Sequence, residues 1–235
     1  MTSHPHPEGA PMTSLPIDVY DEFTSRNRGF IPRESQQRLR AATVLVAGCG
    51  STGGAVVEPL TRLGVEDFVL ADNGTYELNN LNRQSAGHRE IGQNKAEVCA
   101  RHVAEINPGA RTRVATAGIQ PDTVAAMVAS CDVVVDGVDV TEPAGWRAKY
   151  ALHEAAARLR RPVISGYDMA GTQYVRFYDY RRPTVAFDGA ITAGQVDEGR
   201  TWSLLRRVVP LRVVPVEMLE SARRSREHLR ALGLT

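Results

Sequence analysis

Thr43-Val44-Leu45-Val46-Ala47-Gly48-Cys49-Gly50-Ser51-Thr52-Gly53-Gly54 joins a short apolar run to a glycine-rich loop. The run is typical of a buried strand, and the residues that follow, as far as Leu63, have helical spacing. Without side chains, the glycines allow the backbone to approach a phosphate group at the N-terminus of the following helix. The loop, with Gly48, Gly50 and Gly53, therefore predicts a nucleotide-binding strand–loop–helix unit, with a tight turn that binds nothing as the alternative.

Strands and helices alternate along the rest of the chain, as in a parallel α/β sheet. We expect strands at 43–47, 68–71, 112–115, 132–136 and 162–165, and helices at 52–63, 93–106, 122–129 and 146–159. The alternating segment 172–178 predicts an antiparallel strand, and 215–233 predicts an amphipathic helix with Leu219 facing inward. The expected fold is an α/β, Rossmann-like, doubly wound and mainly parallel sheet with antiparallel strands added toward the C-terminus.

Composition sets the domain organisation and excludes several partners. A chain of 235 residues with 43% hydrophobic content predicts a single domain, residues 21–235, after a disordered N-terminal tail, residues 1–20. Lys and Arg number 28 against 27 Asp and Glu, which predicts no general nucleic-acid binding. Three cysteines without metal-type spacing indicate a reducing compartment. No apolar run approaches the roughly 20 residues that cross a bilayer, so we expect no membrane association and a cytoplasmic location.

Polar residues downstream of the glycine loop indicate a nucleoside triphosphate. Asp72 follows the second strand, where a carboxylate meets a ribose hydroxyl. The segment Leu78–Gln84 offers the donors Asn80, Arg83 and Gln84, and Lys95 begins a later helix. Asp136 and Asp139 end a central strand, where a magnesium ligand is expected. Hydride transfer would not need these donors, so the pattern favours a nucleoside triphosphate with Mg²⁺ over a dinucleotide.

Several segments between Arg26 and Gly166 resemble the ubiquitin-activating-enzyme-like adenylyltransferases of the ThiF, MoeB and HesA type: VLVAGCG, LTRLGV, NLNRQ, IGQNKAE, INP and DVVVDGVD. The resemblance implies ATP-dependent adenylation of a carboxylate, commonly the C-terminal glycine of a ubiquitin-like carrier or a peptide. It implies that Asp72 holds the ribose, that Asp139 holds magnesium, and that the phosphates contact Asn80, Arg83 and Lys95. It also implies a homodimer in which Arg26 enters the partner's site, so that Arg83, Lys95, Asp139 and Arg26 form the catalytic set.

The chain departs from the family pattern at specific positions. Gly74 replaces a second acidic residue, and Val140 replaces an asparagine after the metal aspartate. No CxxC pair follows Ile164 and no cysteine follows Cys131, so we expect neither a zinc module nor a thioester nucleophile, and activation that stops at the acyl adenylate.

Two other functions and several substrates remain open. An NAD-dependent oxidoreductase would use the same glycine loop and Asp72, and a degenerate nucleotide-binding scaffold would fit Gly74 and Val140. The activated acid is left open between a ubiquitin-like carrier protein, a peptide and a small carboxylic acid. Tyr167 and Asp168 are candidate substrate contacts, because they lie near the carboxyl end of a strand.

Overall fold

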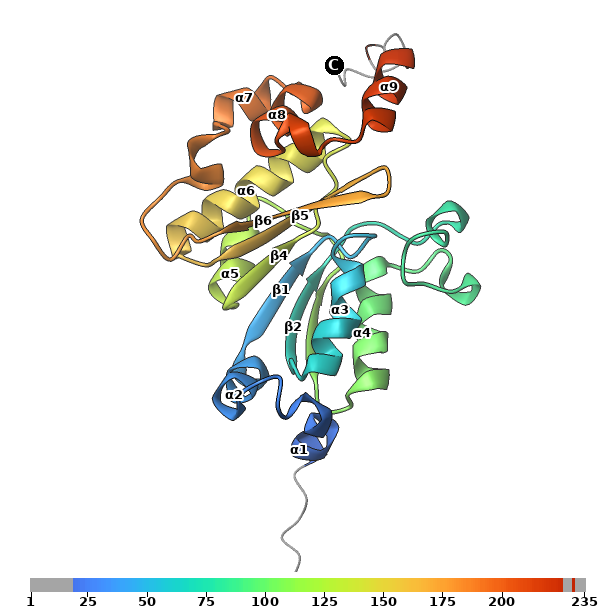
Figure 1. Cartoon of the computed structure of the whole chain (residues 1–235), viewed down its shortest axis with the longest axis vertical. Coiled ribbons are helices and arrows are strands. Elements are labelled where there is room, and N and C mark those ends of the chain that lie inside the picture. Colours follow the sequence, from blue (N-terminus) through green and yellow to red (C-terminus); the bar gives the residue numbers. More distant parts are fainter. Residues whose placement is uncertain (1–18, 226–229, 231–235) are drawn as a thin grey trace, which may run out of the picture.

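A six-stranded sheet forms the centre of the structure, a computed structural model that describes residues 19–225 and residue 230 (Figure 1). Its strands are β1 (Thr43–Ala47), β2 (Asp67–Ala71), β3 (Arg111–Ala115), β4 (Val133–Asp136), β5 (Val163–Met169) and β6 (Thr172–Tyr178). The strand order is β3-β2-β1-β4-β5-β6, with parallel pairing throughout except for the antiparallel β5–β6 pair. The predicted fold class, including the antiparallel strand, is confirmed.

Helices cover both faces of the sheet (Figure 1). The described helices are α1 (Val19–Phe23), α2 (Arg33–Ala41), α3 (Gly54–Leu63), α4 (Lys95–Ile106), α5 (Val124–Ala129), α6 (Pro143–Leu159), α7 (Ala193–Asp197), α8 (Thr201–Val208) and α9 (Val216–Arg224). Successive side chains of a strand point to opposite faces of the sheet, so β1 contributes apolar side chains to the cores on both faces. Val44 and Val46 pack in the cluster that includes α3 and α4 residues, whereas Leu45 and Ala47 pack with α5 and α6 residues.

Local chemistry determines where several elements begin and end. Gly64 ends α3 in a left-handed conformation, with φ of 101°, as the sequence predicts. The Asn94 side chain caps α4 by accepting a hydrogen bond from the Ala96 amide at 3.0 Å. For α5 the expected start at residue 122 is wrong, because Thr123 holds the cap position and makes no side-chain cap bond. The helix begins at Val124, two residues into the expected segment.

The two ends of the described chain lie at opposite ends of the molecule (Figure 1). The N-terminal segment packs near the end of α3, where the Tyr20 hydroxyl donates to the Gly64 carbonyl at 2.8 Å. Helices α7 to α9 lie beyond α6 (Figure 1). Leu219 on α9 is 38% exposed, so its expected inward position is wrong, and most of the expected continuation to residue 233 lies outside the described residues. The expected disordered tail, residues 1–20, lies almost entirely outside them too.

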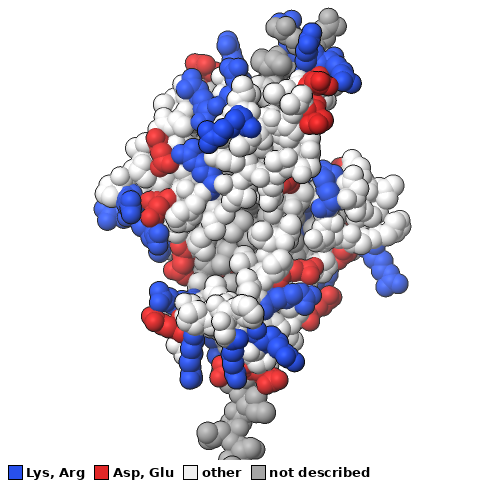
Figure 2. All heavy atoms as spheres, in the orientation of Figure 1, with Lys and Arg blue, Asp and Glu red and all other residues white. Residues whose placement is uncertain are grey.

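The surface reflects the nearly balanced charge. On the face shown in Figure 2, basic and acidic side chains lie together around the edge and surround a mostly uncharged area. Within residues 19–225, no helix is long and apolar enough to cross a membrane.

Candidate active site

The glycine loop brings three backbone segments into close contact. Gly48 has a φ of 83°, and a Cβ there would lie 2.5 Å from the Gly137 carbonyl oxygen. A Cβ on Gly53 would lie 1.9 Å from the Gly48 carbonyl oxygen. Only glycine therefore permits this approach between the end of β1, the start of α3 and the end of β4. The result is a compact loop at the carboxyl edge of the sheet.

A cavity of about 940 Å³ opens at this edge. It lies where the strand order reverses between β1 and β4, which is the usual ligand site in doubly wound sheets. Its wall includes the glycine loop, the ends of β2 and β5, the loop after β3, residues 137–148, and parts of α8 and α9. Its volume is at the upper end of the range of about 300–1,000 Å³ for small-molecule sites.

Asp72 is held rigidly at the end of β2. Its Oδ2 accepts a hydrogen bond from the Cys49 amide at 2.6 Å, and its Oδ1 accepts one from the Gly74 amide at 2.7 Å. The carboxylate lines the cavity, and each oxygen keeps a further lone pair for an incoming hydroxyl. This geometry suits the ribose contact that the sequence predicts.

Basic groups line the same cavity. Arg83 is exposed and its Nη1 donates to the Asn79 carbonyl at 3.1 Å and to Asn82 Oδ1 at 3.0 Å. Lys95 is the first residue of α4, so its side chain adds to the positive end of the helix dipole. Gln84 also lines the cavity, and its amide lies 3.8 Å from the position of a Cβ on Gly50. Together these groups give the cavity wall positive charge and hydrogen-bond donors, which suit an anionic ligand.

Asn80 and Gly53 are not among the residues that line the cavity. Asn80 is buried, and its Oδ1 accepts from the Glu77 amide at 3.2 Å while its Nδ2 donates to Asn79 Oδ1 at 2.9 Å. These bonds close the short turn Leu78–Asn80, just before Arg83. The geometry therefore gives Asn80 a positioning role, and its predicted phosphate contact stays a prediction.

Asp139 lines the cavity and fits a magnesium ion that arrives with a triphosphate. The residue is exposed, and its Oδ1 accepts a hydrogen bond from the Thr141 amide at 2.8 Å. Within the described part of the chain, no group of three or more His, Cys, Asp or Glu residues could hold a metal ion. Magnesium keeps several waters and commonly binds one or two carboxylates together with substrate phosphates, so a single carboxylate is sufficient here.

Asp136 does not belong to this site, contrary to the expected pair with Asp139. It is fully buried, and its Oδ2 lies 2.6 Å from Lys149 Nζ and 2.9 Å from His153 Nε2. The Ser165 hydroxyl donates to the same oxygen at 2.6 Å. Burial alone would raise the pKa of Asp136, but the Lys149 ammonium and the His153 hydrogen bond lower it below its ordinary value. The carboxylate is a structural anchor for the end of β4.

His153 extends this buried network. Its Nδ1 lies 2.7 Å from the Tyr180 hydroxyl, which also accepts a hydrogen bond from the Phe187 amide. The Tyr180 proton is therefore directed to Nδ1, and the Nε2 proton to Asp136. Burial lowers the pKa of His153, which keeps the ring neutral.

Arg26 lies far from its own chain's cavity. It belongs to a short turn, Ser25–Asn27, and is exposed. The neighbouring Asn27 donates to the Leu63 carbonyl at 3.2 Å, which places the turn by the C-terminal end of α3, at the opposite edge of the sheet from the glycine loop. Figure 1 shows this separation between α1 and the carboxyl ends of the strands. Arg26 therefore cannot complete the site of its own chain in this arrangement.

The structure adds residues that sequence patterns do not indicate. Ile119 and Gln120 line the cavity from the loop after β3, and Arg147 lines it from α6. Trp202, Leu205 and Met218 line it from the C-terminal helices. Trp202 and Leu205 share a helix face, but no local signal shows that this face turns back to the site. The candidate substrate contacts Tyr167 and Asp168 both line the cavity, and Asp168 Oδ2 accepts from the Thr52 hydroxyl at 2.8 Å.

A glycine loop at the switch point, beside a cavity lined by Asp72 and by basic side chains, is the arrangement found in nucleotide-binding α/β proteins. The model of the ThiF family matches residues 24–192, and the chain belongs to that family. Among solved structures, it is similar to the E. coli tRNA N6-threonylcarbamoyladenosine dehydratase TcdA in complex with ATP. That match has a TM-score of 0.61 and 27% identity, and covers 68% of this chain and 64% of that chain.

Curated relatives are similar over part of their length. The SAMP-activating enzyme E1 of Haloferax volcanii is 31% identical over 134 residues, which are 57% of this chain and 48% of the relative. The uncharacterized protein MT1398 of Mycobacterium tuberculosis is 33% identical over 180 residues, which are 76% of this chain and 24% of the relative. The chain thus matches from about a quarter to about half of the length of these relatives.

Proposed function

We propose that this protein activates a carboxylate by ATP-dependent adenylation. One observation carries the proposal: Asp72, Arg83, Lys95 and Asp139 line a single cavity around the glycine loop. The relatives' names agree with it, since they include a SAMP-activating enzyme E1 and a "probable molybdopterin-synthase adenylyltransferase". An NAD-dependent oxidoreductase finds no such support among them.

In the proposed step, a carboxylate oxygen attacks the α-phosphorus of ATP. A new P–O bond forms, the bond from the α-phosphorus to the bridging oxygen breaks, and pyrophosphate leaves with that electron pair. Arg83 and Lys95 stabilise the negative charge that develops on the phosphates, because preorganised donors are strongest in a partly enclosed site. Asp139 would hold a magnesium ion, which neutralises phosphate charge when it is bound. The acyl adenylate is then attacked by a separate nucleophile.

Isotope exchange between pyrophosphate and ATP tests the proposal, with carrier proteins, peptides and small acids each supplied as the carboxylate. We expect exchange with at least one class, and a loss of about 100-fold or more in Lys95→Ala and in Arg83→Ala. Arg89→Ala is the matched control, because Arg89 is exposed in the same segment between β2 and α4 and does not line the cavity. Undiminished exchange in both cavity variants would refute the roles assigned to Arg83 and Lys95.

Nucleotide selectivity provides an independent test. ATP with magnesium should raise the thermal unfolding temperature, and NAD should not, because Arg83 and Lys95 match a polyphosphate. A degenerate scaffold would show the ATP shift without exchange in the presence of any carboxylate. Protection by NAD alone would instead favour an oxidoreductase.

We also infer a homodimer in which Arg26 serves the partner's site. The uncovered face of β5 and β6 exposes Ile164 (38%), Val175 (54%) and Phe177 (54%). Phe177 pairs with Ile164 across the two strands, so these apolar side chains share one face of the sheet. Such a patch suits burial against a second copy.

Subunit mixing tests the shared site. Arg26→Ala and Asp139→Ala proteins, each inactive alone, should regain partial exchange activity after mixing, because one hybrid site carries both intact residues. A mixture that stays inactive despite demonstrated subunit exchange, or a monomeric active species in light scattering, would exclude the shared site.

A further inference from the structure

The strand order divides the cavity into regions. Asp72 at the end of β2, and Ile119 and Gln120 after β3, mark the region for the nucleoside, since the ribose contact belongs at that strand. The glycine loop after β1 marks the region of the cavity for the phosphates. Beyond β4, the cavity continues over β5, where Tyr167 and Met169 line it. This last region is left for the second substrate.

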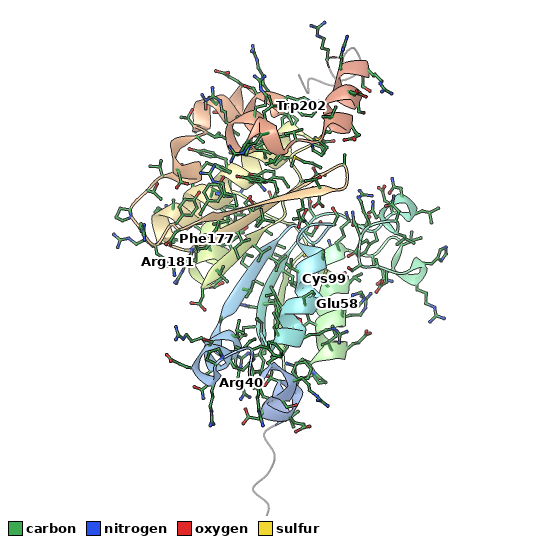
Figure 3. The ribbon with its side chains drawn as sticks, in the orientation of Figure 1. Arg40, Glu58, Cys99, Phe177, Arg181 and Trp202 are labelled. Carbon is green, nitrogen blue, oxygen red and sulfur yellow. The ribbon has the colours of Figure 1, made fainter. Side chains whose placement is uncertain are left out.

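Several apolar side chains of this region come from elements that follow the family match. Trp202 and Leu205 contribute from α8 and Met218 from α9, and all three follow residue 192, where the match ends. Trp202 and Leu205 are three residues apart and so share one helix face. Met169 is 2% exposed and Leu205 9%, while Trp202 and Met218 are partly buried against the same core. Figure 3 shows Trp202 at the end of the molecule that carries α8 and α9.

One polar atom in this wall lacks a partner. Thr201 is 7% exposed and lines the cavity, and its Oγ1 is buried without a hydrogen bond to any described residue. Buried hydroxyls are nearly always paired, because an unpaired one loses its hydration without compensation. A ligand that offers one hydrogen-bonding group beside an apolar group would satisfy both Thr201 and the wall around it.

We propose that the compartment formed by Met169, Thr201, Trp202, Leu205 and Met218 binds the part of the substrate adjacent to its carboxyl group. The inference rests on the proposed function and deepens it: the activated acid carries a bulky apolar group next to the carboxylate, with a hydrogen-bonding group that Thr201 contacts. A terminal glycine would leave the compartment unfilled, and an acidic side chain would be desolvated against its apolar side chains. The acid is therefore distinct from one that ends in two glycines.

Pyrophosphate exchange with matched acids tests the specificity. The probes are short peptides that differ only in a C-terminal Leu, Phe, Gly or Asp, and free acids with the same groups, such as 4-methylpentanoic and acetic acid. We expect the apolar member of each set to have a kcat/KM at least about 10-fold above its glycine or acetate counterpart. The peptide and free-acid arms distinguish a chain terminus from a small metabolite as the source of the same chemistry.

Variants locate the effect in the compartment. Trp202→Ala should raise the KM for the apolar acid about 10-fold with the KM for ATP unchanged, and Thr201→Val should weaken the same substrate while retaining its shape. Leu211→Ala is the control, because Leu211 is 59% exposed in the same C-terminal segment and does not line the cavity. If Trp202→Ala fails to fold, Met218→Ser on the separate helix α9 gives the same test.

The outcomes separate the two proposals. Exchange with no acid of any class would overturn the proposed function itself. Exchange that prefers terminal glycine or aspartate, or that is insensitive to Trp202→Ala and Met218→Ser, would leave adenylation standing and overturn the apolar compartment.

Discussion

Lys149→Met tests whether the buried network at the end of β4 supports the site. Lys149 and Asp136 are both fully buried, with Nζ 2.6 Å from Oδ2. Methionine retains most of the side-chain volume but leaves the Asp136 charge with the hydrogen bonds from His153, Ser165 and the Val138 amide and without a cation. Removal of one partner of a buried ion pair costs about 3–5 kcal/mol. For a chain of this size each kcal/mol lowers the unfolding temperature by about 2–4 °C, so we expect a decrease of about 6–20 °C.

Urea denaturation and thermal unfolding, monitored by circular dichroism, measure this loss. The double variant Asp136→Asn/Lys149→Met also removes the unpaired carboxylate charge. It should recover at least half of the lost stability, because a neutral pair needs no counterion. Arg158→Met, on the exposed side of the same helix, should change stability little. Two results would refute the reasoning about the buried charge. One is a decrease in the free energy of unfolding of Lys149→Met of less than about 1 kcal/mol, and the other is a double variant that is no more stable than the single variant.

Three further predictions follow from individual contacts. Gly53→Ala should destabilise the protein and abolish ATP protection, since its Cβ would lie 1.9 Å from the Gly48 carbonyl oxygen; Gly194→Ala, where no atom lies within 4 Å, is the control in thermal unfolding. His153 has a lowered pKa, so the unfolded state binds its proton first as the pH falls through about 6.5, and the free energy of unfolding decreases as the pH falls through that range. His153→Gln should remove that part of the pH dependence in urea titrations, and an unchanged slope would contradict it. Asp139→Asn should raise the magnesium concentration needed for half-maximal exchange, whereas the exposed Asp197→Asn should not.

The nucleotide half of the cavity could be predicted from sequence because its signals are local. The run Thr43–Ala47 and the glycines after it specify a strand, a turn and a helix within one short segment. The strand that ends before Asp72 and the helix that begins at Lys95 are similarly marked by apolar runs and caps. Parallel strands place their carboxyl ends at one edge, so these residues converge wherever the sheet forms.

Asp136 and Asp139 show what local sequence signals cannot predict. Both lie near the end of β4 and look equivalent in the sequence, but one is fully buried and the other lines the cavity. The difference depends on Lys149 and His153, which reach Asp136 only when α6 packs on the sheet. The spacing of residues between Asp136 and Asp139 does not indicate which of the two carboxylates is buried.

The sequence by itself determined the fold class, the anion-binding character of the site and the family, because periodicity, glycines and short polar motifs act over neighbouring residues. Only the tertiary structure decided which acidic residue faces the cavity, that Asn80 supports the loop rather than lining the cavity, and that α8 and α9 close its far side. Those outcomes depend on packing between segments distant in the chain, such as Met169 with Trp202 and Leu205, and a local pattern contains no record of such contacts.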